Sequence, residues 1–104
     1  MDIENNVMEL LVQAGSARST ILSALQLARA GDHQQATLMM NEAKTAISAA
    51  HRMQTELISL DEGAGKIPVS LILVHAQDHL MNAMLIQDLA IDMLELYRRL
   101  PRGE

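Results

Sequence analysis

Residues 69–86 constrain the fold of this chain more than any other feature, because this stretch is apolar on almost every side of a helix. Its apolar positions leave no continuous polar face: Val69, Leu71, Ile72, Leu73, Val74, Ala76, Leu80, Met81, Ala83, Met84, Leu85 and Ile86. A helix that is apolar all round needs burial on every side. Two neighbouring helices of the same chain cover only part of such a surface. The pattern therefore predicts an oligomer with this helix at its centre.

Two other segments carry apolar residues at steps of three and four, which is the spacing of one helix face. They span about residues 3–30 and 33–59, and the apolar helix spans about residues 68–100. No segment shows the alternation of a strand. The chain is predicted to be a single all-α domain over residues 1–104, folded as an antiparallel three-helix bundle.

The connections between these helices are short and carry recognisable signals. Gly31 ends the first helix, and the spacing of Asp32 and Gln35 is that of a capping box at the start of the second. Residues 60–68 contain two glycines and two acids and form the only long loop. Pro68 is expected as the first residue of the third helix, where its fixed φ angle is tolerated.

The composition excludes several functional classes. The net charge of −5 and the lack of Phe and Trp argue against a nucleic-acid interface. No cysteine is present for a disulfide or a thiolate metal site. The acidic N-terminus does not resemble a signal peptide, and no apolar run is long enough for a membrane span. We expect a cytoplasmic protein that is not inserted in the membrane.

Gly15 and Arg18 are unusual residues within the first helix. Gly15 costs about 1 kcal/mol relative to Ala in a helix, which suggests the close approach of another helix or a ligand. Arg18 is the only basic residue in the sequence AGSARS. It is either a surface residue whose stem lies along the core or a binding residue.

Asp78 interrupts a line of apolar residues on the third helix. At steps of three and four this line contains Leu71, Val74, Asp78, Met81, Leu85, Leu89 and Asp92. If the line faces a symmetry axis, several carboxylates converge and cannot all remain ionised without compensation. An oxygen-bound divalent cation such as Mg²⁺ would neutralise them. Protonation, or an Asp78 that faces outward, is the alternative.

His75 and His79 lie four residues apart on a neighbouring line of the same helix, so both rings can reach one small group. They could simply pack at a helix interface. They could bind zinc, although further ligands are needed and Ala76 stands where a metalloprotease motif has Glu. One of them could also be a nucleophile that attacks phosphorus. Among the remaining histidines, His51 is expected to be half-buried and His33 to be solvated.

The string VSLILVHAQDHLM, together with AGSARSTILSAL, AGD and AHRMQTEL, resembles the IIA component of the lactose/cellobiose phosphotransferase family over about residues 7–99. The HAQDH form is more similar to the cellobiose or diacetylchitobiose branch than to the lactose branch, which tends to have Gly at position 76. The resemblance implies a cytoplasmic homotrimer of three-helix subunits that serves the uptake of a β-linked disaccharide.

The resemblance also implies roles for the motif residues. His75 would accept a phosphoryl group from HPr and pass it to a cysteine of the cognate IIB component. Asp78 would gather around a divalent metal at the trimer axis, and Gln77 and His79 would help to position the phosphoryl group or the imidazole. Exposed apolar residues near His75, such as Ile72, are candidate contacts for these partners.

This sequence departs from the family at the Gly-Asp turn, where His33 replaces an aromatic residue. Two other functions remain open at this point. One is a helical adaptor or structural oligomer without phosphoryl transfer, and the other is a zinc hydrolase built on His75 and His79.

Overall fold

The structure is a computed structural model that describes residues 2–101. It contains the helices α1 (Ile3–Arg29), α2 (His33–Asp61) and α3 (Leu71–Arg99). No strand occurs in this part of the chain. The predicted all-α fold with three helices is therefore confirmed.

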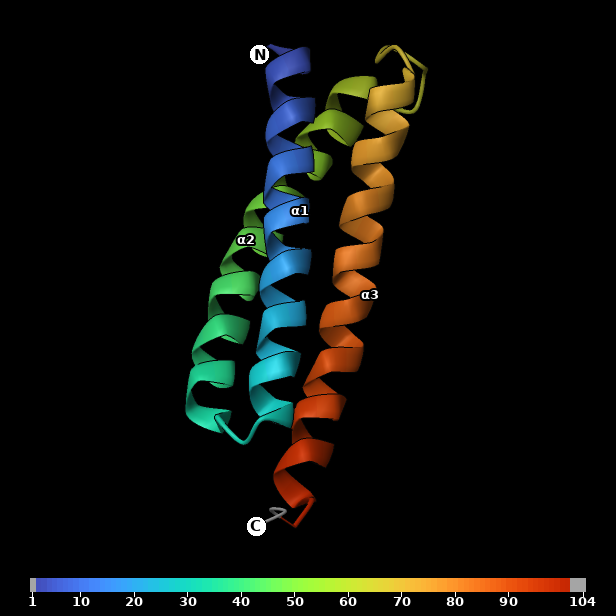
Figure 1. The fold of residues 1–104 in the computed structure, drawn as a ribbon. Coiled ribbons are helices and arrows are strands. Elements are labelled where there is room, and N and C mark those ends of the chain that lie inside the picture. The colour runs from blue at the N-terminus through green and yellow to red at the C-terminus, as the bar shows by residue number, and fades with distance from the viewer. Residues whose placement is uncertain (1, 102–104) are drawn as a thin grey trace.

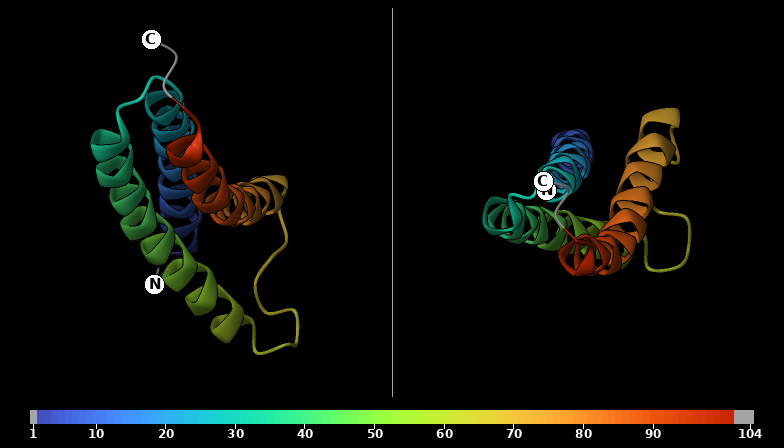
Figure 2. Two further views of the ribbon diagram at one scale, coloured as in Figure 1. Left: turned by 90° about the horizontal axis from the view of Figure 1, so that it is seen from below. Right: turned by 60° about the horizontal axis from the view of Figure 1, so that its bottom comes forward.

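The three helices form an elongated body of 58 × 19 × 19 Å. Figure 1 shows that consecutive helices run in opposite directions, so that α1 and α3 point the same way. Helix α1 packs against both other helices, whereas α2 and α3 have a smaller mutual contact. Figure 2 shows the loop between α2 and α3 as an open connection at one end of the molecule. This arrangement covers α3 from one side only.

The first two helices begin at aspartate caps. The Asp2 carboxylate accepts a hydrogen bond from the Asn5 backbone N–H, and the Asp32 carboxylate accepts one from the Gln35 N–H at 3.1 Å. The backbone N–H of Asp32 donates to the carbonyl of Leu27. Asp32 thus caps α2 as predicted, but the reciprocal half of the capping box is not used, because that N–H already has a partner.

The ends of the last two helices differ from the sequence prediction. Helix α3 begins at Leu71 rather than Pro68, because Ser70 is its cap and accepts a hydrogen bond from the Leu73 N–H at 3.2 Å. Helix α2 continues two residues past Ser59, to Asp61, and Glu62 ends it in the left-handed conformation with φ of 55°. The loop is therefore shifted toward the C-terminus.

Small and aliphatic residues fill the interior between the helices. One cluster, toward the His75 end of α3, contains Val7, Leu10, Ala14, Ala50, Leu57, Ile67, Leu73, Ala76 and Leu80. A second, toward the other end, includes Ala17, Ile21, Ala28, Ala36, Met40, Ala43, Ile47, Ala83, Ala90 and Leu94. Alanine at so many contact positions lets the helix backbones approach closely, and the predicted apolar faces of α1 and α2 are those that are buried.

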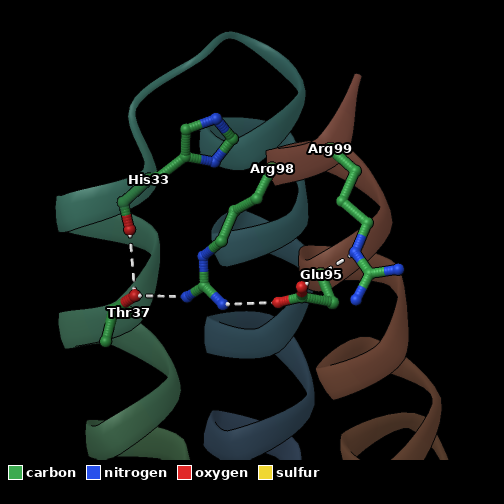
Figure 3. Close-up of polar contacts among 5 residues, drawn as sticks. All are labelled: His33, Thr37, Glu95, Arg98 and Arg99. Atoms are coloured by element: carbon green, nitrogen blue, oxygen red, sulfur yellow. Dashed lines mark hydrogen bonds and ion pairs between the residues drawn. The ribbon is translucent and has the colours of Figure 1, made fainter.

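Polar contacts join α2 to the last turn of α3 (Figure 3). The Arg98 guanidinium donates to the Thr37 hydroxyl at 3.0 Å and to the Glu95 carboxylate at 3.3 Å, and Glu95 also accepts from Arg99. These hydrogen bonds, that from Arg99 first, hold the pKa of Glu95 below its usual value. His33 lies beside this group and is half-buried, with Nδ1 enclosed and unpaired. The expectation that His33 is solvated was wrong: the residue is half-buried and lies beside the Arg98 side chain, which reaches from α3 to Thr37 on α2.

None of the helices within residues 2–101 combines the length and the hydropathy that a membrane crossing requires.

Candidate functional site

A continuous face of α3 is left uncovered by the other two helices. We call this face the α3 seam; its members are Leu71, Val74, Asp78, Met81, Leu85, Leu89 and Asp92, and all are exposed. Leu71 is 87% exposed and Leu85 is 59% exposed. A monomeric protein rarely leaves such a contiguous apolar surface in water. The single chain thus fails to bury the apolar helix, as its sequence pattern predicts.

The Asp78 carboxylate lies within the α3 seam and forms no hydrogen bond or ion pair with any other residue of the described chain. None of the described polar or charged residues is buried. The polar residues of the apolar stretch are therefore not buried within one subunit. They can become buried only against another molecule.

The donor set for a divalent cation at Asp78 is incomplete in one chain. Within residues 2–101 no group of three His, Cys, Asp or Glu side chains could hold a metal ion. One exposed carboxylate supplies a suitable hard oxygen ligand, but Mg²⁺ needs six oxygens. Asp78 therefore fits a magnesium site only if several copies of the chain contribute to it and water completes the shell.

His75 and His79 face each other on successive turns of α3. Their Nε2 atoms are 3.1 Å apart, and the ring centroids are 4.4 Å apart with the planes inclined at 76°. The two Nε2 atoms form a hydrogen bond when one of them carries a proton and the other offers its lone pair. His75 is exposed, whereas His79 is half-buried with Nδ1 enclosed and unpaired. His79 therefore restricts the orientation of the exposed His75 ring.

Gln77 lies on the opposite flank of α3 from the histidine pair. Its side-chain oxygen accepts a hydrogen bond from the amide of Gln54 on α2. The structure thus does not bring Gln77 into contact with His75. Gln77 instead joins α2 to α3 where these helices otherwise touch little, and its direct role in catalysis stays a prediction.

A groove between the first turns of α1 and α3 lies close to the histidine pair. Its volume is about 500 Å³, and its lining consists of Ile3, Glu4, Val7, Met8, Pro68, Ser70, Ile72 and Leu73. Ile72 is 42% exposed and lies one turn before His75. The sequence indicated Ile72, but it gave no reason to select Met8 or Glu4, because their proximity to α3 depends on helix packing.

The structure also bears on three smaller predictions. A Cβ atom at Gly15 would meet nothing within 4 Å, so no other helix within residues 2–101 makes the close approach that Gly15 suggested. Arg18 is exposed, which is compatible with both of its alternatives, so its role stays a prediction. His51 is exposed rather than half-buried, because it points away from the core face of α2 that contains Ala50.

Comparison with known proteins covers nearly the same part of the chain as the resemblance found in the sequence. Residues 5–98 match the family described as "PTS system, Lactose/Cellobiose specific IIA subunit". The chain is 46% identical over 99 residues to the N,N'-diacetylchitobiose-specific EIIA component of the phosphotransferase system of Escherichia coli (strain K12). The match covers 95% of this chain and 85% of that protein.

Two solved structures are similar to the whole helical domain. The cellobiose-specific enzyme IIA from Bacillus anthracis superimposes with a TM-score of 0.89 at 40% identity, covering 95% of this chain and 91% of the other. IIA(Chitobiose) of Escherichia coli, solved in complex with HPr, superimposes with a TM-score of 0.81 at 43% identity, covering 95% and 96%. The resemblance inferred from the HAQDHLM string is thus confirmed.

Proposed function

Because this chain belongs to the lactose/cellobiose-specific IIA family of the phosphotransferase system, we propose that it carries a phosphoryl group on His75. The donor is HPr, and the acceptor is a cysteine of the cognate IIB component. The transported sugar is a β-linked disaccharide of the cellobiose or chitobiose type. The observation that carries the assignment to His75 is an exposed imidazole whose Nε2 lies against a second imidazole at 3.1 Å.

The transfer consists of two displacements at phosphorus. A neutral His75 nitrogen donates its lone pair to the phosphorus of the phosphorylated donor, and the bond between phosphorus and the donor breaks. The IIB thiolate then attacks the same phosphorus, and the electron pair of the P–N bond returns to His75. The protein contributes mainly position and charge stabilisation to such transfers. His79 is a positioning residue, since its ring contacts that of His75.

The docking of both partners requires an accessible site, and two features support this. His75 is exposed, and the groove beside Ile72 offers apolar surface with Glu4 at its edge. The partners must bind in turn and leave, which suits a modest interface. The complex of IIA(Chitobiose) with HPr supports HPr as the donor.

The active form is proposed to be a homotrimer in which the α3 seams of three copies meet on the symmetry axis. The exposure of the apolar residues in this seam supports the proposal. The three Asp78 carboxylates would then hold a divalent cation, Mg²⁺ by preference, whose charge offsets their repulsion. Asp78 serves the assembly, and phosphoryl transfer takes place at His75 on the flank of the helix.

The test is the intact mass of the protein after incubation with phosphoenolpyruvate, enzyme I and HPr. We expect a single acid-labile phosphate on the wild-type chain and on the control variant His51→Ala, and none on folded His75→Ala. Undiminished labelling of His75→Ala would refute the assignment. A folded wild-type protein that takes no phosphate would refute the function itself.

A further inference from the structure

The histidine pair of α3 has a geometry that phosphoryl transfer alone does not require. The two Nε2 atoms converge to 3.1 Å, and each belongs to a ring that solvent can reach at least in part. Two nitrogens bound to one zinc ion at about 2.0–2.1 Å lie about 2.8–3.4 Å apart when the N–Zn–N angle is between about 90° and the tetrahedral value. The observed separation falls inside this interval.

The backbone already holds the two rings in this arrangement. Residues four apart on a helix are neighbours on one face, so a metal does not need to recruit ligands from distant segments. Binding would exchange the shared hydrogen bond for two metal–nitrogen bonds, with the proton of each ring on Nδ1. The Nδ1 proton of His79 would be enclosed without a partner, which limits the affinity.

We propose that His75 and His79 form a two-nitrogen chelating site for a late first-row divalent cation such as Zn²⁺, Ni²⁺ or Cu²⁺. Imidazole suits these ions and does not suit Mg²⁺. Within residues 2–101 no third His, Cys, Asp or Glu side chain joins the pair, so water completes the shell and the metal exchanges readily. This site differs from the proposed magnesium site in donor type and in place, since Asp78 lies on the α3 seam.

Metal binding and phosphorylation exclude each other at His75, a consequence that rests on the proposed function. When Nε2 donates its lone pair to a metal, the ring keeps its proton on Nδ1. Neither nitrogen then has a lone pair with which to attack phosphorus. The cation is therefore an inhibitor of phosphoryl acceptance, and it acts on the nucleophile itself.

The chelate is tested first without any phosphoryl transfer, by calorimetric titration of the metal-free, unphosphorylated protein with ZnCl₂. We expect one zinc ion per chain for the wild type and for the control His51→Gln. His79→Gln should weaken zinc binding more than about tenfold, because the loss of a residue that only hydrogen-bonds a metal ligand already lowers metal affinity by about that factor. MgCl₂ should give no response at the pair. Zinc binding that is absent from the wild type, or unchanged in His79→Gln, would overturn the proposal.

Nitrogen-15 spectra of the histidine rings provide a second readout. Zinc should bring both rings to the tautomer with the proton on Nδ1, while the signals of His33 and His51 stay in place. With HPr as donor, stoichiometric zinc should then abolish labelling, and a chelator should restore it. Labelling that persists on zinc-loaded protein would refute the exclusion. If the metal-free wild type takes no phosphate but binds zinc at the pair, the proposed function fails and the chelate stands.

Discussion

The substitution Leu85→Lys tests the proposed assembly through the α3 seam. Leu85 is 59% exposed in the single chain, and full burial of a leucine contributes about 1.5–3 kcal/mol. Burial of the exposed part then contributes about 0.9–1.8 kcal/mol per chain, or about 3–5 kcal/mol for three copies. Since about 1.4 kcal/mol corresponds to a factor of ten, the loss of Leu85 raises the trimer dissociation constant by about two to four orders of magnitude.

A lysine at this position adds to the loss, because three ammonium groups approach the axis. The flexible lysine stem relieves part of this repulsion by carrying the charge toward solvent. The repulsion that remains adds to the lost burial, so the rise of about two to four orders of magnitude in the dissociation constant is the smallest effect expected. The folded monomer should survive, since Leu85 belongs to neither core cluster.

The assay is sedimentation velocity over a series of protein concentrations, with circular dichroism to confirm that the helices remain. The control is Leu38→Lys, which changes an exposed leucine of α2 (51% exposed) outside the seam. We expect the wild type and Leu38→Lys to sediment as trimers under conditions in which Leu85→Lys is a helical monomer. A Leu85→Lys protein that remains trimeric at every concentration, or a monomeric wild type, would refute the argument.

Three further predictions concern single residues. Asp78→Leu should leave the trimer assembled, with a thermal midpoint equal to or above that of the wild type and independent of Mg²⁺, because apolar packing replaces a charge cluster; an unfolded monomer would contradict the axial site. Gly15→Ala should raise the free energy of unfolding by about 1 kcal/mol in chemical denaturation, because the new Cβ meets nothing within 4 Å, and a loss of stability would show that another molecule uses this space. Glu95→Gln should lower the thermal midpoint at neutral pH, because the hydrogen bonds from Arg99 and Arg98 lower the pKa of Glu95 in the folded state. That contribution is present above the unfolded-state pKa and is lost as the pH falls through the folded-state value, so the midpoints of wild type and variant should converge in acid; a constant difference would argue against the ion pair as its source.

The sequence by itself determined the number of helices, their buried faces and the uncovered face of α3. These properties follow from local periodicity: steps of three and four fix which residues share a side of a helix. His75 and Asp78 are three residues apart, so the same periodicity places them on neighbouring lines of the helix, with Asp78 in the α3 seam and His75 beside it. The HAQDHLM string identified the family, because a specific order of residues is itself sequence information.

Only the tertiary structure decided where these faces meet other helices. The start of α3 after the Ser70 cap rather than at Pro68 is different, because the cap is a local hydrogen bond with Leu73 that the sequence itself offered. The pairing of Gln77 with Gln54, and the proximity of Met8 to Ile72, depend on how α2 and α1 are placed beside α3. The half-buried His33 lies beside Arg98, which is 65 positions later in the sequence and reaches Thr37 from α3. Contacts between distant segments are set by packing, and local periodicity carries no information about them.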